Sequence, residues 1–83
     1  MTEHVLRTAP DSAAHARLYR QLMELAVHAQ ELRARCRRLR RGLVHLSPQR
    51  RPQIERELHE VQGELERVDS AIANVKAALA LRA

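Results

Sequence analysis

Arginine side chains gather around the middle of the 83-residue chain. No acidic residue occurs between Glu31 and Glu55, whereas eight arginines do. Guanidinium groups bind phosphates and carboxylates, so this run predicts a basic patch that could contact nucleic acid or an acidic protein surface. A solvated helix face without any partner is the alternative. The patch comprises Arg37, Arg38, Arg40, Arg41, Arg50 and Arg51, with Arg33 and Arg35 beside it.

The residues that most often perform catalysis or hold metals do not form a recognisable set. None of the five histidines lies three or four residues from another, which is the spacing that places two imidazoles on one helix face. Cys36 falls at an apolar helical position and is expected to be a small buried residue. We therefore expect a protein that is not an enzyme and that uses no metal, cofactor or small-molecule substrate.

The hydrophobic pattern predicts two long helices that would position the arginines. Apolar residues from Leu18 to Leu46 alternate at spacings of four and three, and the same alternation runs from Ile54 to Leu79. This heptad pattern is typical of a coiled coil, and we call these two stripes the seam. Tyr19 is the only Phe, Tyr or Trp residue, which also favours long helices over a mixed globular core.

Two prolines divide the helical pattern. Segment 47–52 reads Ser-Pro-Gln-Arg-Arg-Pro, and two prolines four residues apart cannot both lie in an undisturbed helix interior. Ser47 is expected to cap the second helix, with Pro48 at its first position. The predicted fold is all-α, a two-helix antiparallel coiled-coil hairpin over 11–83. Its expected parts are a mobile arm 1–10, a helix 11–46 capped by Asp11 or Ser12, a hinge 47–51 and a helix 52–82. Regular helical geometry is expected from about residue 51, at the end of the hinge.

Folding at the hinge predicts which residues face each other. Leu43 would lie opposite Ile54, Leu32 opposite Leu65, and Leu18 opposite Leu79. Charges beside the seam are opposite in sign on the two helices, as pairing across a coiled coil requires. The flanking residues are Arg33, Arg35 and Arg40 on the first helix and Glu55, Glu57, Glu64 and Asp69 on the second.

A two-helix hairpin of this size is marginally stable, so we expect its core to be completed by oligomerisation or by a partner's helices. Apolar residues outside the seam occur at the open end, which is the end away from the hinge. Their alternative role is to widen the intramolecular stripe. The predicted partner-binding residues are Tyr19, Met23, Ala26, Val27, Ala71, Ala78 and Leu81.

Parts of the chain resemble the small hairpin co-chaperones of bacterial type III secretion needle subunits. The similar parts are the run Cys36-Arg37-Arg38-Leu39-Arg40-Arg41-Gly42, the break containing Pro52, and Glu64-Leu65-Glu66 leading into Ala71-Ile72. They cover about half the chain, which departs from that family by a longer hinge with two prolines and by stronger heptads. The resemblance implies a non-catalytic hairpin that docks on a helical-repeat chaperone and helps keep an export substrate from polymerising.

Taken together, these patterns favour a helical-hairpin protein–protein interaction module, such as an adaptor, scaffold or co-chaperone subunit of a bacterial secretion system. The alternative function is a nucleic-acid-binding hairpin that uses its Arg-rich hinge end. A lone cysteine and the absence of an apolar signal segment in residues 1–10 predict a cytoplasmic bacterial protein. No apolar run approaches the ~20 residues that would span a membrane.

Overall fold

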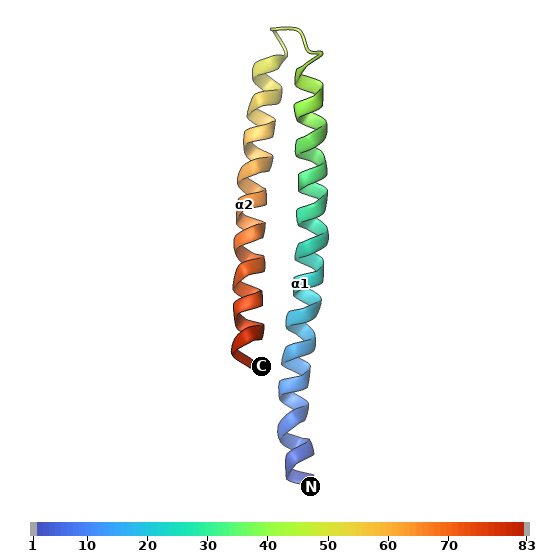
Figure 1. The fold of residues 1–83 in the computed structure, drawn as a ribbon, viewed down its shortest axis with the longest axis vertical. Helices are drawn as coiled ribbons and strands as arrows, with labels where there is room; N and C mark the ends of the chain where they lie inside the picture. Colours follow the sequence, from blue (N-terminus) through green and yellow to red (C-terminus); the bar gives the residue numbers. More distant parts are fainter. Residues whose placement is uncertain (1, 83) are drawn as a thin grey trace.

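The protein is a helical hairpin. The computed structural model describes the backbone of residues 2–82 and the side chains of residues 12–82. Helix α1 (Thr2–Leu43) and helix α2 (Arg51–Arg82) lie side by side and antiparallel, joined by the turn 44–50 (Figure 1). The molecule is a rod of 70 × 15 × 14 Å. The predicted all-α hairpin is confirmed, and residues 2–82 contain no strand.

Helix α1 begins at Thr2, upstream of the expected start at Asp11 or Ser12. Pro10 therefore lies inside the helix, where it lacks the N–H that would donate one backbone hydrogen bond, and the chain stays helical upstream of it. Because α1 is longer than α2, its N-terminal end projects past the end of α2 (Figure 1). The mobility expected of residues 1–10 stays a prediction.

The turn is longer than the expected hinge at its N-terminal side, because α1 ends at Leu43 and not at residue 46. The amide of His45 donates to the carbonyl of Gly42 over 3.1 Å, which closes the end of α1. Glycine loses more conformational freedom in a helix than other residues, and the residue before Pro48 is pushed out of the helical region. Together these two effects end the helix one turn early.

Helix α2 begins close to where the sequence predicts. The carbonyl of Ser47 accepts hydrogen bonds from the amides of Arg50 at 3.1 Å and Arg51 at 3.2 Å. Ser47 thus precedes the helix as a capping residue does, since its carbonyl accepts the first hydrogen bonds of the helical type. Pro52 lies in the first turn of α2, where its missing N–H leaves no internal partner unsatisfied.

A narrow core fills the space between the helices. The buried cluster consists of Ala29, Leu32 and Cys36 from α1 with Val61 and Val68 from α2. All five are seam residues, and Cys36 is only 3% exposed, as expected. The expected register places Ala29 opposite Val68 and Cys36 opposite Val61, so that small residues of α1 meet valines of α2. Around this cluster pack Leu25, Leu39, Leu58, Leu65 and Ile72.

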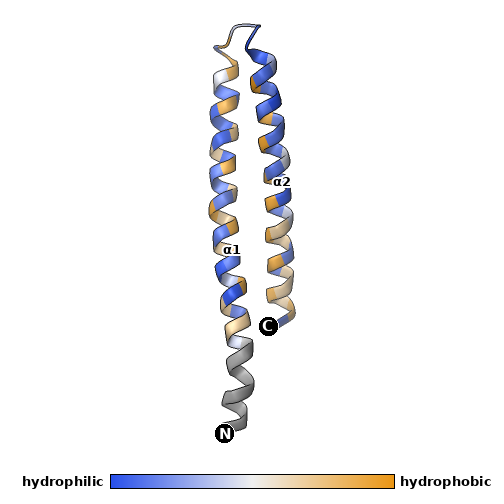
Figure 2. Ribbon diagram, turned by 180° about the vertical axis from the view of Figure 1, so that it is seen from behind, coloured by the Kyte–Doolittle hydropathy of each residue, from blue (hydrophilic) through white to orange (hydrophobic). Residues whose placement is uncertain are grey.

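The seam side chains become less buried toward the open end. Val75 is the last buried side chain of α2, whereas Leu18, Leu22 and Leu79 are only partly buried. Helix α2 nevertheless becomes more hydrophobic in this direction, changing from mostly hydrophilic near the hinge to mostly hydrophobic toward its C-terminal end (Figure 2). The open end therefore carries apolar surface that the two helices do not bury between themselves.

Candidate protein-interaction groove

Ion pairs cross between the helices on both flanks of the seam. On one flank Arg33 Nη2 lies 2.9 Å from Asp69 Oδ1, and on the other Arg35 Nη2 lies 2.6 Å from Glu57 Oε1. The hydrogen bond to Glu57 raises the pKa of Arg35 above its ordinary value, so this guanidinium stays charged. The opposite charges predicted for these flanking positions therefore meet as expected.

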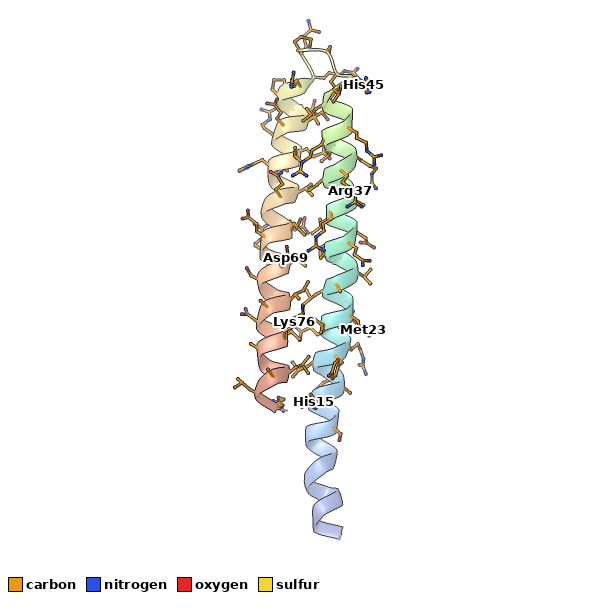
Figure 3. The ribbon with its side chains drawn as sticks, viewed as in Figure 1. His15, Met23, Arg37, His45, Asp69 and Lys76 are labelled. Carbon is orange, nitrogen blue, oxygen red and sulfur yellow. The ribbon has the colours of Figure 1, made fainter. Side chains whose placement is uncertain are left out.

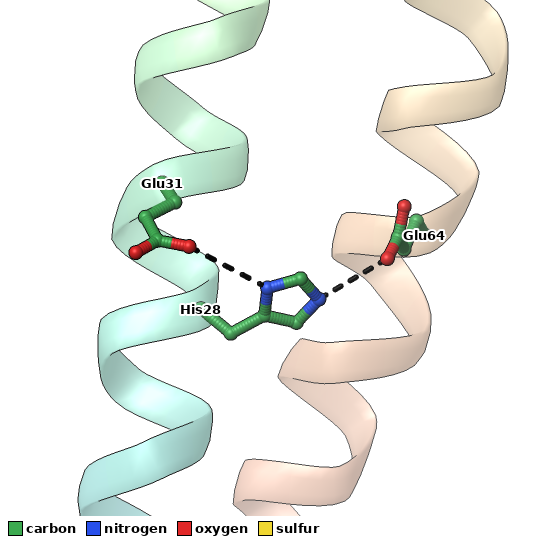
Figure 4. Close-up of polar contacts among 3 residues, drawn as sticks. All are labelled: His28, Glu31 and Glu64. Carbon is green, nitrogen blue, oxygen red and sulfur yellow. Dashed lines mark hydrogen bonds and ion pairs between the residues drawn. The ribbon is translucent and has the colours of Figure 1, made fainter.

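His28 forms a third contact across the hairpin, on the Arg35 flank. Its Nε2 lies 3.1 Å from Oε1 of Glu64 on α2, and its Nδ1 lies 4.0 Å from Oε2 of Glu31 on α1 (Figure 4). The spacing of the histidines relative to one another gives no sign of this role, because the partners of His28 are carboxylates. The signal in the sequence is the register, which brings Glu64 to the turn of α2 that faces His28.

A hollow of about 600 Å³ lies between the helices on the Arg33 flank, toward the open end. The exposed alanines Ala26 and Ala73 line it and leave it unfilled, because their methyl groups do not reach across to the other helix, and Ala29, which is fully buried in the core, lies at its base. The Arg33–Asp69 ion pair and Lys76 contribute the charged part of its wall. The remaining lining residues are Leu22, Gln30 and Ile72.

Two further hollows continue this flank toward the hinge. One, of about 300 Å³, is lined by Cys36, Gln62 and Leu65 with Arg33, Arg37 and Arg40. The next, of about 420 Å³, is lined by Arg37, Arg40 and Arg41. Neighbouring hollows share lining residues, Arg33 between the first two and Arg37 and Arg40 between the second and third, so they follow one another along this side of the rod. We call these three hollows the long groove.

Only part of the predicted partner-binding set belongs to the long groove. Ala26 lines it, and Met23 and Tyr19 lie about one and two turns away from Ala26 along α1. Both are large apolar side chains in solvent, with Tyr19 55% and Met23 69% exposed. Met23 stands at about the height of Lys76 on α2 (Figure 3). The Tyr19 ring also packs at 5.7 Å, centroid to centroid, against the ring of His15.

The other predicted partner-binding residues lie elsewhere. Val27 and Leu81 each follow a seam residue by two positions, which turns them away from the opposite helix, and both are exposed. Ala71 lines a separate shallow hollow with Gly63 on the outside of α2, and Ala78 is partly buried. The structure therefore does not bring the seven residues into one surface.

The structure also divides the predicted basic patch. Arg37, Arg40 and Arg41 line the long groove, and the Nε of Arg41 donates to the backbone carbonyl of Arg37 over 3.4 Å. Arg38 and Arg50 are exposed outside it. Arg51 is neutralised by Glu55 on its own helix, at 3.2 Å, so Glu55 does not reach across the seam. Within residues 12–82, no ion pair involves the five remaining patch arginines, Arg37, Arg38, Arg40, Arg41 and Arg50.

The groove also contains residues that the sequence analysis did not select. Gln30, Ala73 and Lys76 line it, and each follows a seam residue by one position. This shared position on one flank, together with the small size of Ala26 and Ala73, is the pattern that would have indicated the groove. Among residues 12–82, no three His, Cys, Asp or Glu side chains lie close enough to hold a metal ion.

No helix within the described chain is long and apolar enough to cross a membrane. Comparisons of the chain with protein-family models, with curated proteins and with solved structures give no match.

Proposed function

We propose that this protein is a non-catalytic helical-hairpin module for protein–protein interaction, which packs its open end and long groove against additional helices. The observation that carries the proposal is the alanine-lined hollow between the helices, with Tyr19 and Met23 exposed beside it. Helices pack by inserting side chains into such depressions between ridges.

The balance of burial supports the same function. Six side chains in the described chain are buried, and the largest of them is Leu32, whereas Tyr19 and Met23 beside the groove remain more than half exposed. Covering a large apolar side chain contributes about 2 kcal/mol, so a third helix would add stability that two helices do not supply. Adaptor, scaffold and co-chaperone roles all fit this type of module.

The experiment combines sedimentation equilibrium with titration of a neutral, leucine-rich helical peptide against the isotopically labelled protein. The test variant is M23E/A26E, and the control is V27E/V44E, which places the same charges on exposed apolar positions outside the groove. Self-association or peptide binding should be lost in M23E/A26E and kept in the control. A monomer that binds no peptide, or equal loss in both variants, would overturn the proposal.

A second candidate function is nucleic-acid binding at the hinge end. The observation in its favour is that Arg37, Arg40 and Arg41 surround one hollow without a carboxylate partner. Binding to a mixed-sequence DNA or RNA duplex, measured at low and high salt, tests it. Phosphate contacts predict a steep loss of affinity with salt, and no binding at the low salt concentration would reject this function.

The role as a co-chaperone of a type III secretion needle subunit is a narrower form of the first proposal. Docking on a helical-repeat chaperone would place a partner helix against the same groove. This role and the cytoplasmic bacterial location stay predictions from the sequence.

A further inference from the structure

The two halves of the long groove differ in chemistry. Toward the open end its lining is mainly apolar and includes Ala26, Ala29 and Ala73, whereas toward the hinge it is lined by the side chains of Arg37 and Arg40. Ala26 and Arg40 are about 21 Å apart along α1 at the rise of an α-helix. A helix of about four turns would therefore contact both halves at once.

We infer that the long groove binds an amphipathic helix of another protein, which carries apolar residues over the alanine-lined half and acidic residues over the arginine-lined half. This inference rests on the proposed function and names the partner's chemistry. Arg37 and Arg40 have no ion pair within residues 12–82, so a partner's carboxylates would be their first. Arginine forms bidentate contacts with carboxylates, which would also fix the position of the helix along the groove.

A second copy of this chain supplies the wrong charges. In an antiparallel pair, Arg37 and Arg40 would face the open end of the other copy, where residues 70–82 include Lys76 and Arg82 and no acidic residue. Segment 12–30 of α1 has one acidic residue, Glu24, which precedes a seam residue and so lies on the flank opposite the long groove. In a parallel pair, the same arginines would face each other. Like charges placed opposite one another reduce affinity, so both arrangements leave the basic half of the groove without complementary charge.

A nucleic acid matches only half of the groove. Its phosphates would pair with the arginines, but the alanine-lined half has no aromatic ring on which a base could stack. Of the two cations in its lining, Arg33 is already paired with Asp69, which leaves only Lys76 for a phosphate. Phosphate binding would also use Arg38 and Arg50, which are exposed outside the groove. The acidic-helix inference assigns the contacts to Arg37 and Arg40, so the two partners predict different effects for the two pairs.

The test titrates two synthetic helical peptides against the labelled full-length protein at physiological salt. The first carries leucines on one half of a stripe and glutamates on the other half, and the second replaces these glutamates with glutamine. The protein variants are R37E/R40E and R38E/R50E, which change the net charge equally on and off the groove. Fluorescence anisotropy measures affinity, and amide chemical shifts locate the peptide.

The acidic peptide should bind wild type and bind R37E/R40E about tenfold more weakly. In this variant two exposed arginine–glutamate pairs are replaced by glutamates facing the glutamates of the peptide. Its affinity for R38E/R50E should change by less than about threefold, since screening weakens charges that make no contact. Amide shifts should appear at Ala26 and Ala73 as well as at Arg37 and Arg40.

Several results would overturn the inference. Equal weakening in both variants would show diffuse attraction, and tight binding of the glutamine peptide would reject an acidic partner while leaving the proposed function intact. Failure of both peptides would reject the inference and the proposed function together. A dimer that competes with the peptide would assign the groove to a second copy. A nucleic-acid duplex that displaces the peptide, and whose affinity falls equally in both protein variants, would assign the arginines to phosphate.

Discussion

Arg35 of α1 donates a hydrogen bond to Glu57 of α2, with 2.6 Å between Nη2 and Oε1. This contact joins residues from the two arms near the hinge, and it belongs to the flank opposite the long groove. It therefore helps to set the register of the hairpin without taking part in the proposed interface.

The charge pair can be tested by exchange. Arg35→Glu should lower the melting temperature, because it places two carboxylates opposite each other, and adding Glu57→Arg should recover part of the loss. Circular dichroism melts at low and high salt measure the effect, which should shrink with salt. A double variant no more stable than the weaker single variant would contradict the pairing.

The buried seam should reject a larger residue at Ala29, which is 0% exposed. Ala29→Leu inserts three carbon atoms where α1 lies against Val68, and overpacking of this kind costs about 1–3 kcal/mol of unfolding free energy. Urea unfolding measures the loss. Ala77→Leu on the exposed face of α2 is the matched control and should change stability little. Equal effects at both positions would contradict the close approach of the helices.

Gly63 lies in the interior of α2 and offers room for a methyl group. A Cβ at this position would meet only Arg67 Nη1, at 3.6 Å, which is an ordinary contact. Gly63→Ala should therefore raise the free energy of unfolding by about 0.5–1 kcal/mol, because alanine loses less conformational freedom on helix formation. Gly42→Ala also has space but lies in the last turn of α1, so its gain should be smaller. Thermal unfolding of both variants checks the order, and a loss at Gly63 would contradict the geometry.

The contact from His28 to Glu64 should contribute to stability as one hydrogen bond between helices. His28→Ala is expected to lower the free energy of unfolding by about 1 kcal/mol. His59→Ala on the exposed surface of α2 removes the same ring without such a contact and should have little effect. Chemical unfolding of the two variants in the same buffer measures the difference, and indistinguishable stabilities would show that the His28 contact contributes nothing.

Periodicity predicted the arms of the hairpin because every turn of each helix must place an apolar side chain against the other helix. A residue such as Leu32 or Val61 must face the other helix, so its spacing records the contact surface directly. The end of α1 was harder to predict. The heptad continues to Leu46, and only the combined effect of Gly42 and Pro48 ends the helix at Leu43.

The groove could not be read from hydrophobicity alone, because it arises where side chains are small. Ala26 and Ala73 give no strong signal in the sequence, whereas Val27 and Leu81 do, although both turn away from the opposite helix. Selecting residues by apolar character therefore mixed several faces. Sorting them by flank of the seam would have separated Ala26 from Ala71, which lines a different hollow.

The turn at 44–50 also opposes domain swapping, in which two copies of a chain exchange helices. If the turn straightened, α1 and α2 would become one long helix, and two such chains could satisfy each other's seams in an exchanged dimer. Pro48 and Pro52 oppose this, because a proline in a helix interior costs about 3 kcal/mol. The two prolines therefore act against domain swapping and favour a chain that pairs its own two helices.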